Sequence, residues 1–485
     1  MLRLNPSLVS TNGHSGTMVV DIPRQVAGVS RFTAVGITAW CVGAFLAAAV
    51  IGLNHDPNYA TARALEQVEE GRDVEEKAVM EDGLGVAAAG RVVGFALLLG
   101  VGAFCIATLP NDVRFRWDRL SILIAMGLAW AMASVAWSVE PDTTARELVR
   151  LLAYGGVAAA LALRFDLRTL CFVLAAALAG SVATAVAYEI GTGGFKPWHA
   201  DYRLTGSMHS NILAIQAAIV ALVAYAFALQ PGQRRAFCWA LFTAALAVVV
   251  LTKARTALFT VIAGVVAIHV VGRPARQWLF YAACVMSFAA IALLTASALG
   301  ISDEHGLQNV ANLGRSDDVG DLTGRLPLWN FIWHESEGHR LQGFGWGAFW
   351  LTERVKDARE ALHWFPRHSH NAYLQVMVNL GLVELAIVVA IGLIALRRAA
   401  SLVRRTGLPE ASALVAILIA IFVNGTAESA FVMPRDMGLF SAAAVLSLLV
   451  VRRGTESQDR VSDFERERMA ESRTLVLFPP KVSLS

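Results

Sequence analysis

The sequence predicts an all-α protein that crosses a membrane about twelve times. Of its 485 residues, 56% are hydrophobic and only 16% are charged, whereas soluble proteins carry about 25% charged residues. Apolar runs of about 20 residues recur along the chain, and such a run crosses about 30 Å of hydrocarbon as a helix. Because backbone groups in lipid must pair within their own segment, we expect these runs to be α-helices.

The chain divides into two tails, two membrane regions and one large loop. Residues 1–31 are polar, lack the order of a cleaved signal peptide, and are expected to form a cytoplasmic tail. An N-terminal region of about nine spans covers 32–300, and a C-terminal region of about three spans covers 372–451. Between them, 301–371 forms a large loop on the outer face, so that it separates the ninth span from the tenth. The charged segment 452–485 is expected to be a disordered cytoplasmic tail.

Each expected span is an apolar run bounded by polar or charged residues. In chain order the spans are 32–53, 85–109, 118–137, 147–163, 168–190, 211–229, 236–252, 254–272, 277–300, 372–396, 411–432 and 437–451.

Arginines set the orientation of these spans. Short cytoplasmic loops of membrane proteins are enriched in Lys and Arg. If the N-terminus is cytoplasmic, every even-numbered span returns the chain to the cytoplasm, and each return is basic. The residues concerned are Arg114, Arg116, Arg119, Arg164, Arg168, Arg234, Arg235, Arg273, Arg276, Arg397, Arg398, Arg404, Arg405, Arg452 and Arg453.

The acidic segment 54–84 is expected to be a solvated surface helix.

The outer loops also carry basic residues that the rule for cytoplasmic loops does not explain. Each outer basic residue either anchors a helix end at the headgroups or belongs to an anion-binding cluster. Guanidinium groups offer fixed, paired donors that suit a diphosphate. The residues are Arg203, Lys253, Arg255, Arg325 and Arg435.

Cysteines and histidines do not form a metal motif. His363, His368 and His370 lie close together, but no cysteine or acidic residue stands at ligand spacing. His334 and Glu335 lack the second histidine of H-E-x-x-H. No metal or cofactor is predicted. The cysteines lie in separate apolar runs without C-x-x-C spacing and are expected to be small core residues: Cys41, Cys105, Cys171, Cys238 and Cys284.

The stretch from Leu322 to Leu385 is the longest polar interruption between apolar segments, and it carries a set of ordered motifs. They are Gly324-Arg325, Trp329, Gly343-Phe344-Gly345-Trp346-Gly347, His370-Asn371, Tyr373-Leu374-Gln375 and Gly381-Leu382. Together these motifs resemble the signature region of the O-antigen ligase/polymerase superfamily of bacterial envelope enzymes. A second stretch, SVAWSVEPDTTARELVR around Trp137, looks like one found in exopolysaccharide polymerases of the same superfamily.

The resemblance implies an inverting, metal-independent glycosyltransferase in the bacterial inner membrane, with its active site facing the periplasm. Such an enzyme transfers glycan from undecaprenyl diphosphate to a hydroxyl of a glycan or of lipid A core. The family carries arginines in an R-x-x-G segment and in an S/K-x-R-x-A turn, which match Arg203 and Arg255. The family often has Ser two residues before the second arginine, where this chain has Lys253.

The resemblance also implies the catalytic roles. Arg203, Arg255 and Arg325 would hold the donor diphosphate, with Lys253 as an added cation. His370 would be the general base, and His368 would share its work. The residues alone allow another interpretation of His370, as a helix-start residue followed by Asn371 as the helix cap. If His370 is the base, Asn371 instead orients the histidine or a sugar hydroxyl.

Several further residues leave alternatives open. Glu428 is expected late in the span 411–432, as a site residue or as a structural partner of Arg435. The tryptophans of the signature region either stack on sugars or anchor the chain at the membrane interface; they are Trp329, Trp333, Trp346, Trp350 and Trp364.

The reaction also has alternatives. Ligation, polymerisation and protein O-glycosylation share one donor, and the stretch around Trp137 slightly favours a polymerase. A flippase for the same lipid-linked glycan is the competing class, but the chain shows no matching halves with interrupted helices. Membrane lipid is an expected partner and nucleic acid is not.

Overall fold

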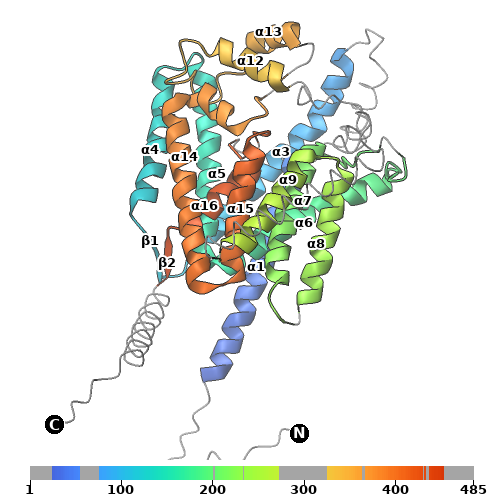
Figure 1. Ribbon diagram of the computed structural model, residues 1–485, viewed down its shortest axis with the longest axis vertical. Helices are drawn as coiled ribbons and strands as arrows, with labels where there is room; N and C mark the ends of the chain where they lie inside the picture. The colour runs from blue at the N-terminus through green and yellow to red at the C-terminus, as the bar shows by residue number, and fades with distance from the viewer. Residues whose placement is uncertain are drawn as a thin grey trace, which may run out of the picture. The chain divides into compact units, whose positions relative to one another are not determined.

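A computed structural model describes most of the chain in two compact units, 1–41 and 42–485. The described part of the first unit, residues 24–41, is the beginning of helix α1 (Arg24–Asn54). The second unit holds all the other labelled elements of Figure 1. The described ranges are 24–54, 76–199, 202–232, 234–271, 273, 325–362, 366, 368–429, 431–432 and 436–452.

The second unit is built almost entirely of helices. Two short strands, β1 (Val113–Phe115) and β2 (Val450–Arg452), pair antiparallel, so the chain is mostly helical but not purely so. Its helices are α3 (Glu76–Ala107), α4 (Arg119–Ala133), the 3₁₀ turn η2 (Ser134–Ala136), α5 (Pro141–Arg164), α6 (Leu167–Gly191), α7 (Ser210–Ala228), α8 (Arg235–Leu251), α9 (Arg255–Val270), α12 (Arg325–Glu335), α13 (Thr352–Leu362), α14 (Ala372–Thr406), α15 (Pro409–Gly425) and α16 (Asp436–Ser447).

Every expected span that falls on described residues coincides with a helix. Six of these helices are long and apolar enough to cross a membrane, namely those containing Gly36–Asn54, Ala89–Ala107, Arg119–Ala136, Leu167–Gly191, Ser210–Ala228 and Ala372–Thr406. Four shorter helices (α8, α9, α15 and most of α16) are also apolar. The expected span 277–300 lies outside the described residues. Twelve crossings therefore remain a prediction, and the expected outer loop 301–371 contains helices α12 and α13.

Helix α7 lies at the centre of the second unit. It packs against α6, α8, α9 and α15, and nearly all of its side chains are buried, including the polar Gln216. Its sequence is apolar on every side, which is the pattern of a fully enclosed helix. The site described below lies at the N-terminal end of this helix.

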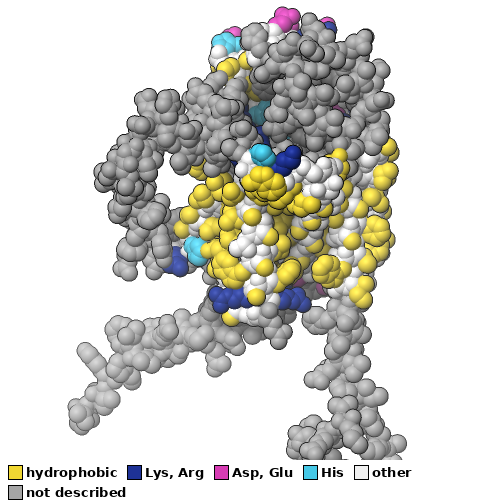
Figure 2. Space-filling model, turned by 90° about the vertical axis from the view of Figure 1, so that its right-hand side faces the viewer, with side chains coloured by type: hydrophobic (Ala, Val, Ile, Leu, Met, Phe, Trp, Pro, Cys, Tyr) yellow, Lys and Arg dark blue, Asp and Glu magenta, His cyan; other side chains and the backbone are white. Residues whose placement is uncertain are grey.

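Loops that the arginine pattern assigns to one membrane face do meet at one end of the second unit. Strand β1 follows the second expected span, β2 lies at the end of the last, and the two strands pair. Asp118 caps α4 and also accepts Arg398 of α14 at 2.9 Å. Arg164, the last residue of α5, donates to the hydroxyl of Thr108, just after α3, at 3.0 Å. Figure 2 shows hydrophobic side chains over the middle of one face and a row of Lys and Arg along its lower edge.

Helix α14 is interrupted near its beginning. Gly381 has φ 78° and ψ −178°, which is not a helical conformation and is essentially accessible only to glycine. The interruption releases backbone groups of α14 from their helical partners. The Gly-rich turn takes them up: Phe344 N donates to Val378 O at 2.9 Å, and Gly345 N donates to Asn379 O at 3.0 Å. In return, Leu382 N donates to Arg340 O at 2.8 Å.

This docking explains why the signature region combines a Gly-rich turn with a second glycine in the next helix. A Cβ at Gly343 would collide with the backbone of Asn379, and one at Gly381 would collide with the carbonyl of Leu341. Two tryptophans fasten the same junction, since Trp130 donates to Leu380 O at 2.9 Å and Trp137 to Gln342 O at 3.1 Å. The first turns of α14 are thereby fixed at the site end of the unit.

We predict that Gly381→Ala destabilises the protein by at least about 3 kcal/mol, because backbone strain costs about 1–3 kcal/mol and the new methyl group meets the Leu341 carbonyl. Thermal unfolding of the purified protein in detergent measures the loss. The matched control is Gly156→Ala in α5, where a Cβ meets nothing within 4 Å and a helical alanine should stabilise by about 0.5–1 kcal/mol. Equal melting temperatures for the two variants would contradict the role given to the break.

Candidate active site

Glu428 lies in the loop after α15, and its buried carboxylate joins residues from three other segments. Its Oε1 accepts Nη2 of Arg325 at 2.7 Å and Nδ2 of Asn211 at 2.6 Å. Its Oε2 lies 3.4 Å from Nδ1 of His370. The first turns of α7 and α12 and the residues just before α14 therefore converge on one carboxylate.

The expected location of Glu428 inside the span 411–432 is wrong, because α15 ends at Gly425. The chain then turns, with the N–H groups of Ala427 and Glu428 both donating to Asn424 O. The turn brings the carboxylate to the helix end, where it reaches polar partners. The expected partner of Glu428, Arg435, lies outside the described residues. Among the described residues, Glu428 pairs with Arg325.

The carboxyl of Glu428 is ionised in this setting. Burial by itself would raise its pKa, but the hydrogen bond and charge of His370, together with the charges of Arg325 and His368, lower the pKa to about 2. The positive ends of the converging helices act in the same direction, since backbone N–H groups at helix N-termini favour negative charge. The surroundings of Glu428 thus favour its charged form.

His370 stands immediately before α14 in a strained conformation. Its φ is 46°, and among the described non-glycine residues only Lys253 shares a positive φ. Its backbone N–H donates to Nδ1 of His368 at 3.2 Å, and the two rings are tilted by 45° with their centroids 4.0 Å apart. Strained residues of this kind gather at functional sites. Both strained residues belong to the set that the sequence singled out.

Asn371 is the cap of α14, as one of the two sequence interpretations expects. Its Oδ1 accepts the N–H groups of Tyr373 and Leu374 at 2.9 and 3.1 Å, and its Nδ2 donates to Thr426 O at 3.1 Å. The side-chain amide is therefore engaged with backbone. It positions His370 by fixing where the helix begins.

A buried network holds the residues on both sides of His370. Ser369 contacts Gln375 and Ser429 through its hydroxyl, at 3.1 and 3.2 Å. The N–H of Asn371 donates to the hydroxyl of Ser429 at 3.1 Å. This explains the glutamine of the Tyr-Leu-Gln motif: Gln375 reaches back one turn to fix the loop that carries the histidine.

Two of the signature tryptophans belong to this network. Trp329 donates to Ser369 O at 2.9 Å, and Trp350 donates to Oε1 of Gln375 at 3.1 Å. Trp346 is buried under the Gly-rich turn with Leu380. Trp333 is exposed and stacks with Arg340, whose guanidinium lies 4.0 Å from the ring centroid. Trp364 lies outside the described residues, as does His363.

Arg203 rests on the turn between α8 and α9. Its Nε donates to Thr252 O and its Nη2 to Oδ1 of Asn211, both at 2.9 Å. Asn211 in turn donates to Glu428, so Arg203 is linked to the carboxylate through one side chain. Lys253 follows Thr252 with φ 50°, and Arg255 is the first residue of α9. The structure thus brings Arg203 and the Lys253–Arg255 turn together, as the sequence suggests.

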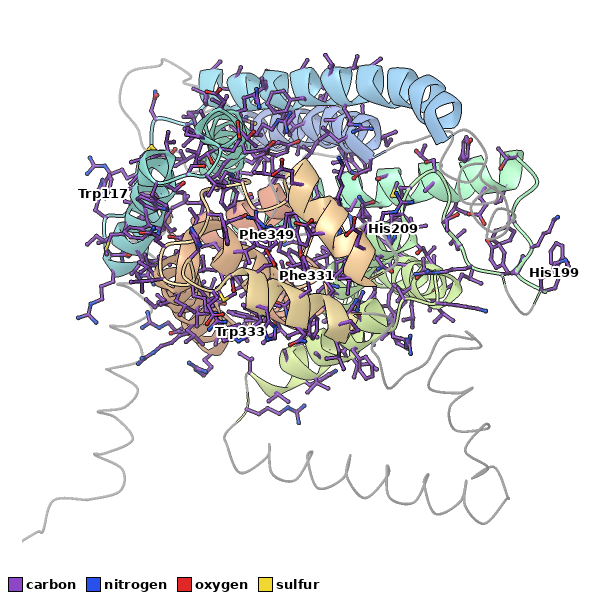
Figure 3. The ribbon with its side chains drawn as sticks, turned by 90° about the horizontal axis from the view of Figure 1, so that it is seen from above. Trp117, His199, His209, Phe331, Trp333 and Phe349 are labelled. Carbon is purple, nitrogen blue, oxygen red and sulfur yellow. The ribbon has the colours of Figure 1, made fainter. Side chains whose placement is uncertain are left out.

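Asn211 is the main residue that sequence reasoning missed. It bridges Arg203 and Glu428. It is a polar residue at the beginning of the expected span 211–229, eight residues after Arg203, and that position is a signal that could have identified it. Figure 3 places His209, which caps α7, beside this region, whereas His199 lies at the outer end of the preceding loop. Within the described residues, no group of three or more His, Cys, Asp or Glu side chains is placed to hold a metal ion.

We predict that Glu428→Gln lowers the stability of the protein by about 3 kcal/mol, because it leaves the charge of Arg325 buried without its partner. Thermal unfolding in detergent measures the change. The control is Glu335→Gln, which removes a wider pair of 3.8 Å whose acidic side chain is 42% exposed; it should shift stability by less than about 0.5 kcal/mol. If Glu428→Gln melts with the native protein, the carboxylate does not organise the site.

The comparisons with known proteins bear on the segment that holds most of this geometry. None of the curated proteins compared with the chain matches it. Residues 239–389 match the model of a family described as O-antigen ligase. That range includes Lys253, Arg255, Arg325, His370 and the Gly-rich turn, whereas Arg203 and Glu428 lie outside it. This part of the chain is therefore similar to the O-antigen ligase family, in agreement with the resemblance that the ordered motifs carry.

Proposed function

We propose that this protein transfers glycan from an undecaprenyl-diphosphate carrier to an acceptor hydroxyl at the periplasmic face of the bacterial inner membrane. The observation that carries the proposal is the convergence of Arg325 and His370 on Glu428, with Arg203 linked to the same carboxylate through Asn211. The match of residues 239–389 to the O-antigen ligase family supports the reaction class. The cluster supports a site for an anionic donor beside a group that can accept a proton.

The donor diphosphate binds to Arg203, Arg255 and Lys253. Arg203 is held in place by Thr252 and Asn211, so its guanidinium needs little reorganisation to meet a phosphate. Arg255 begins α9, where the backbone N–H groups of the first turn also favour an anion. Arg325 is paired with Glu428 and contributes charge from the other side. Fixed cations of this kind stabilise the negative charge that grows on the leaving diphosphate.

His370 is the general base. Glu428 lies against Nδ1 of the imidazole, so it favours the tautomer with the proton on Nδ1 and the lone pair on Nε2. Nε2 removes the proton of the acceptor hydroxyl while the hydroxyl oxygen attacks the anomeric carbon of the donor glycan. The bond from that carbon to the diphosphate oxygen breaks, and undecaprenyl diphosphate leaves with the electron pair. One displacement of this kind inverts the anomeric centre.

The acceptor is a glycan chain or lipid A core, and polymerisation of repeat units is the form that the stretch around Trp137 favours. That stretch lies against the Gly-rich turn, since Val139 N donates to Phe344 O at 3.1 Å. Residues near the turn are therefore placed to influence the acceptor. The reaction needs no divalent cation, because arginines supply the positive charge.

We expect purified protein with an undecaprenyl-diphosphate oligosaccharide to elongate or transfer the glycan in the presence of EDTA. His370→Ala should lower kcat by about 10²–10⁴-fold, the usual contribution of a general base. The product, analysed by gel and mass spectrometry, identifies the acceptor class. The control is His334→Ala, an exposed histidine in the last turn of α12, which should keep native activity. Full activity of folded His370→Ala protein would refute the base assignment.

Arg255→Ala should lower kcat/KM by about 100-fold in the same assay, as removal of one preorganised charge-stabilising donor does elsewhere. Arg359→Ala, an exposed arginine of α13, is the matched control. If native protein moves no glycan between carriers but carries labelled lipid across a bilayer, a flippase replaces the transferase.

A further inference from the structure

Glu189 is a buried acidic residue at the end of α6 that the mechanism above does not use. It is 7% exposed. A carboxylate in the last turn of a helix faces the negative end of the helix dipole, which is unfavourable locally. Its position therefore calls for partners from elsewhere in the chain.

All three partners of the Glu189 carboxylate come from the loop that carries Arg203. Oε1 accepts the hydroxyl of Tyr202 at 2.7 Å. Oε2 accepts the backbone N–H of Thr205 at 3.0 Å and that of Gly206. Tyr202 precedes Arg203 and Thr205 follows it by two residues, so the carboxylate holds the backbone on both sides of the arginine. Burial and the adjacent carboxylate raise the pKa of Tyr202, which keeps its hydroxyl protonated as a donor.

Gly206 brings this loop against α6. Its φ is +61°, and a Cβ there would collide with the backbone carbonyl of Ala185, one turn before Glu189. This is the glycine of the Arg203-x-x-Gly206 pattern. Its role is to let the backbone lie close enough to α6 for the Glu189 carboxylate to accept its N–H.

The same loop is attached on its other side to the α8–α9 turn. Leu204 N donates to Leu251 O at 2.9 Å, next to the contact between Arg203 and Thr252. Glu189 thus fixes one edge of a short segment whose other edge adjoins Lys253 and Arg255. Moving the loop would change the distance between Arg203 and the cations of that turn.

We propose that Glu189 is a positioning residue for diphosphate binding, which sets the location of Arg203 relative to the Lys253–Arg255 turn by clamping residues 202–206 to α6. The inference rests on the proposed function in that it takes a diphosphate as the ligand of Arg203. It assigns Glu189 no contact with substrate. Its effect passes through Arg203.

A double-mutant cycle on ligand binding tests this. The probe is undecaprenyl diphosphate, titrated calorimetrically into detergent-solubilised full-length protein. Glu189→Ala and Arg203→Ala should each weaken binding by about 10-fold or more. The first leaves two buried N–H groups without an acceptor, and the second removes a charged donor to the diphosphate. The double variant should bind within about twofold of Arg203→Ala, because a residue that acts through another adds nothing once the other is gone.

Conservative variants separate positioning from a direct charge effect. Glu189→Gln should bind within about threefold of native protein, because its amide oxygen accepts the two N–H groups and its NH₂ donates to the Tyr202 hydroxyl. Tyr202→Phe should weaken binding of the probe by a smaller factor. It replaces Glu189→Ala in the test if Glu189→Ala does not fold. Native-like binding by Glu189→Ala, or losses that multiply in the double variant, would overturn the inference.

Glycan transfer is measured in parallel and is read separately. If native protein binds the probe and the cycle behaves as expected but no glycan is transferred, the proposed function fails and the role of Glu189 stands. If native protein does not bind undecaprenyl diphosphate, both fail.

Discussion

The ionised carboxylate of Glu428 is the constraint on which the site depends. A buried charge is tolerated only when it is paired and hydrogen-bonded, and Glu428 meets that condition through Arg325, Asn211 and His370. These partners come from separate helices that begin at the same place. The requirement to satisfy one anion therefore selects how the starts of α7, α12 and α14 are arranged. It also orients the imidazole that the mechanism uses.

The break in α14 is the second constraint, and it acts on the same histidine from the C-terminal side. A continuous helix would need no partner for the carbonyls of Val378 and Asn379. The interruption at Gly381 exposes them, and the Gly-rich turn satisfies them through backbone N–H groups. The two motifs are therefore one structural unit, although more than thirty residues of chain, including α13, separate them. Asn371 and Gln375 lie in the short helical segment before the break. That unit therefore also fixes the loop of His370.

Much of this arrangement is predictable from sequence, because local signals determine it. Apolar runs predicted the helices. The span expected at 254–272 put Arg255 at its beginning, and α9 does begin at Arg255. Asn371 followed by an apolar run indicated a helix cap. Partner choice was not predictable in the same way. Asn211 and Glu428 are 217 residues apart, and nothing near either residue specifies the other. Arg325 was not expected as a partner of Glu428, because only tertiary packing brings the two side chains together. Arg435, the expected partner, lies outside the described residues.

The distribution of charge explains how the proposed site for an anionic donor accommodates an acidic residue. Arg203, Lys253, Arg255 and Arg325 would repel one another if they stood together without a counter-charge. Glu428 pairs with Arg325 and reaches Arg203 only through Asn211. Glu428 therefore offsets the charge of Arg325 most directly. The excess positive charge remains near Arg203 and the α8–α9 turn. In the proposed mechanism, the diphosphate binds there and the acceptor proton goes to the histidine beside the carboxylate. A single acidic residue would then keep the leaving group and the base apart.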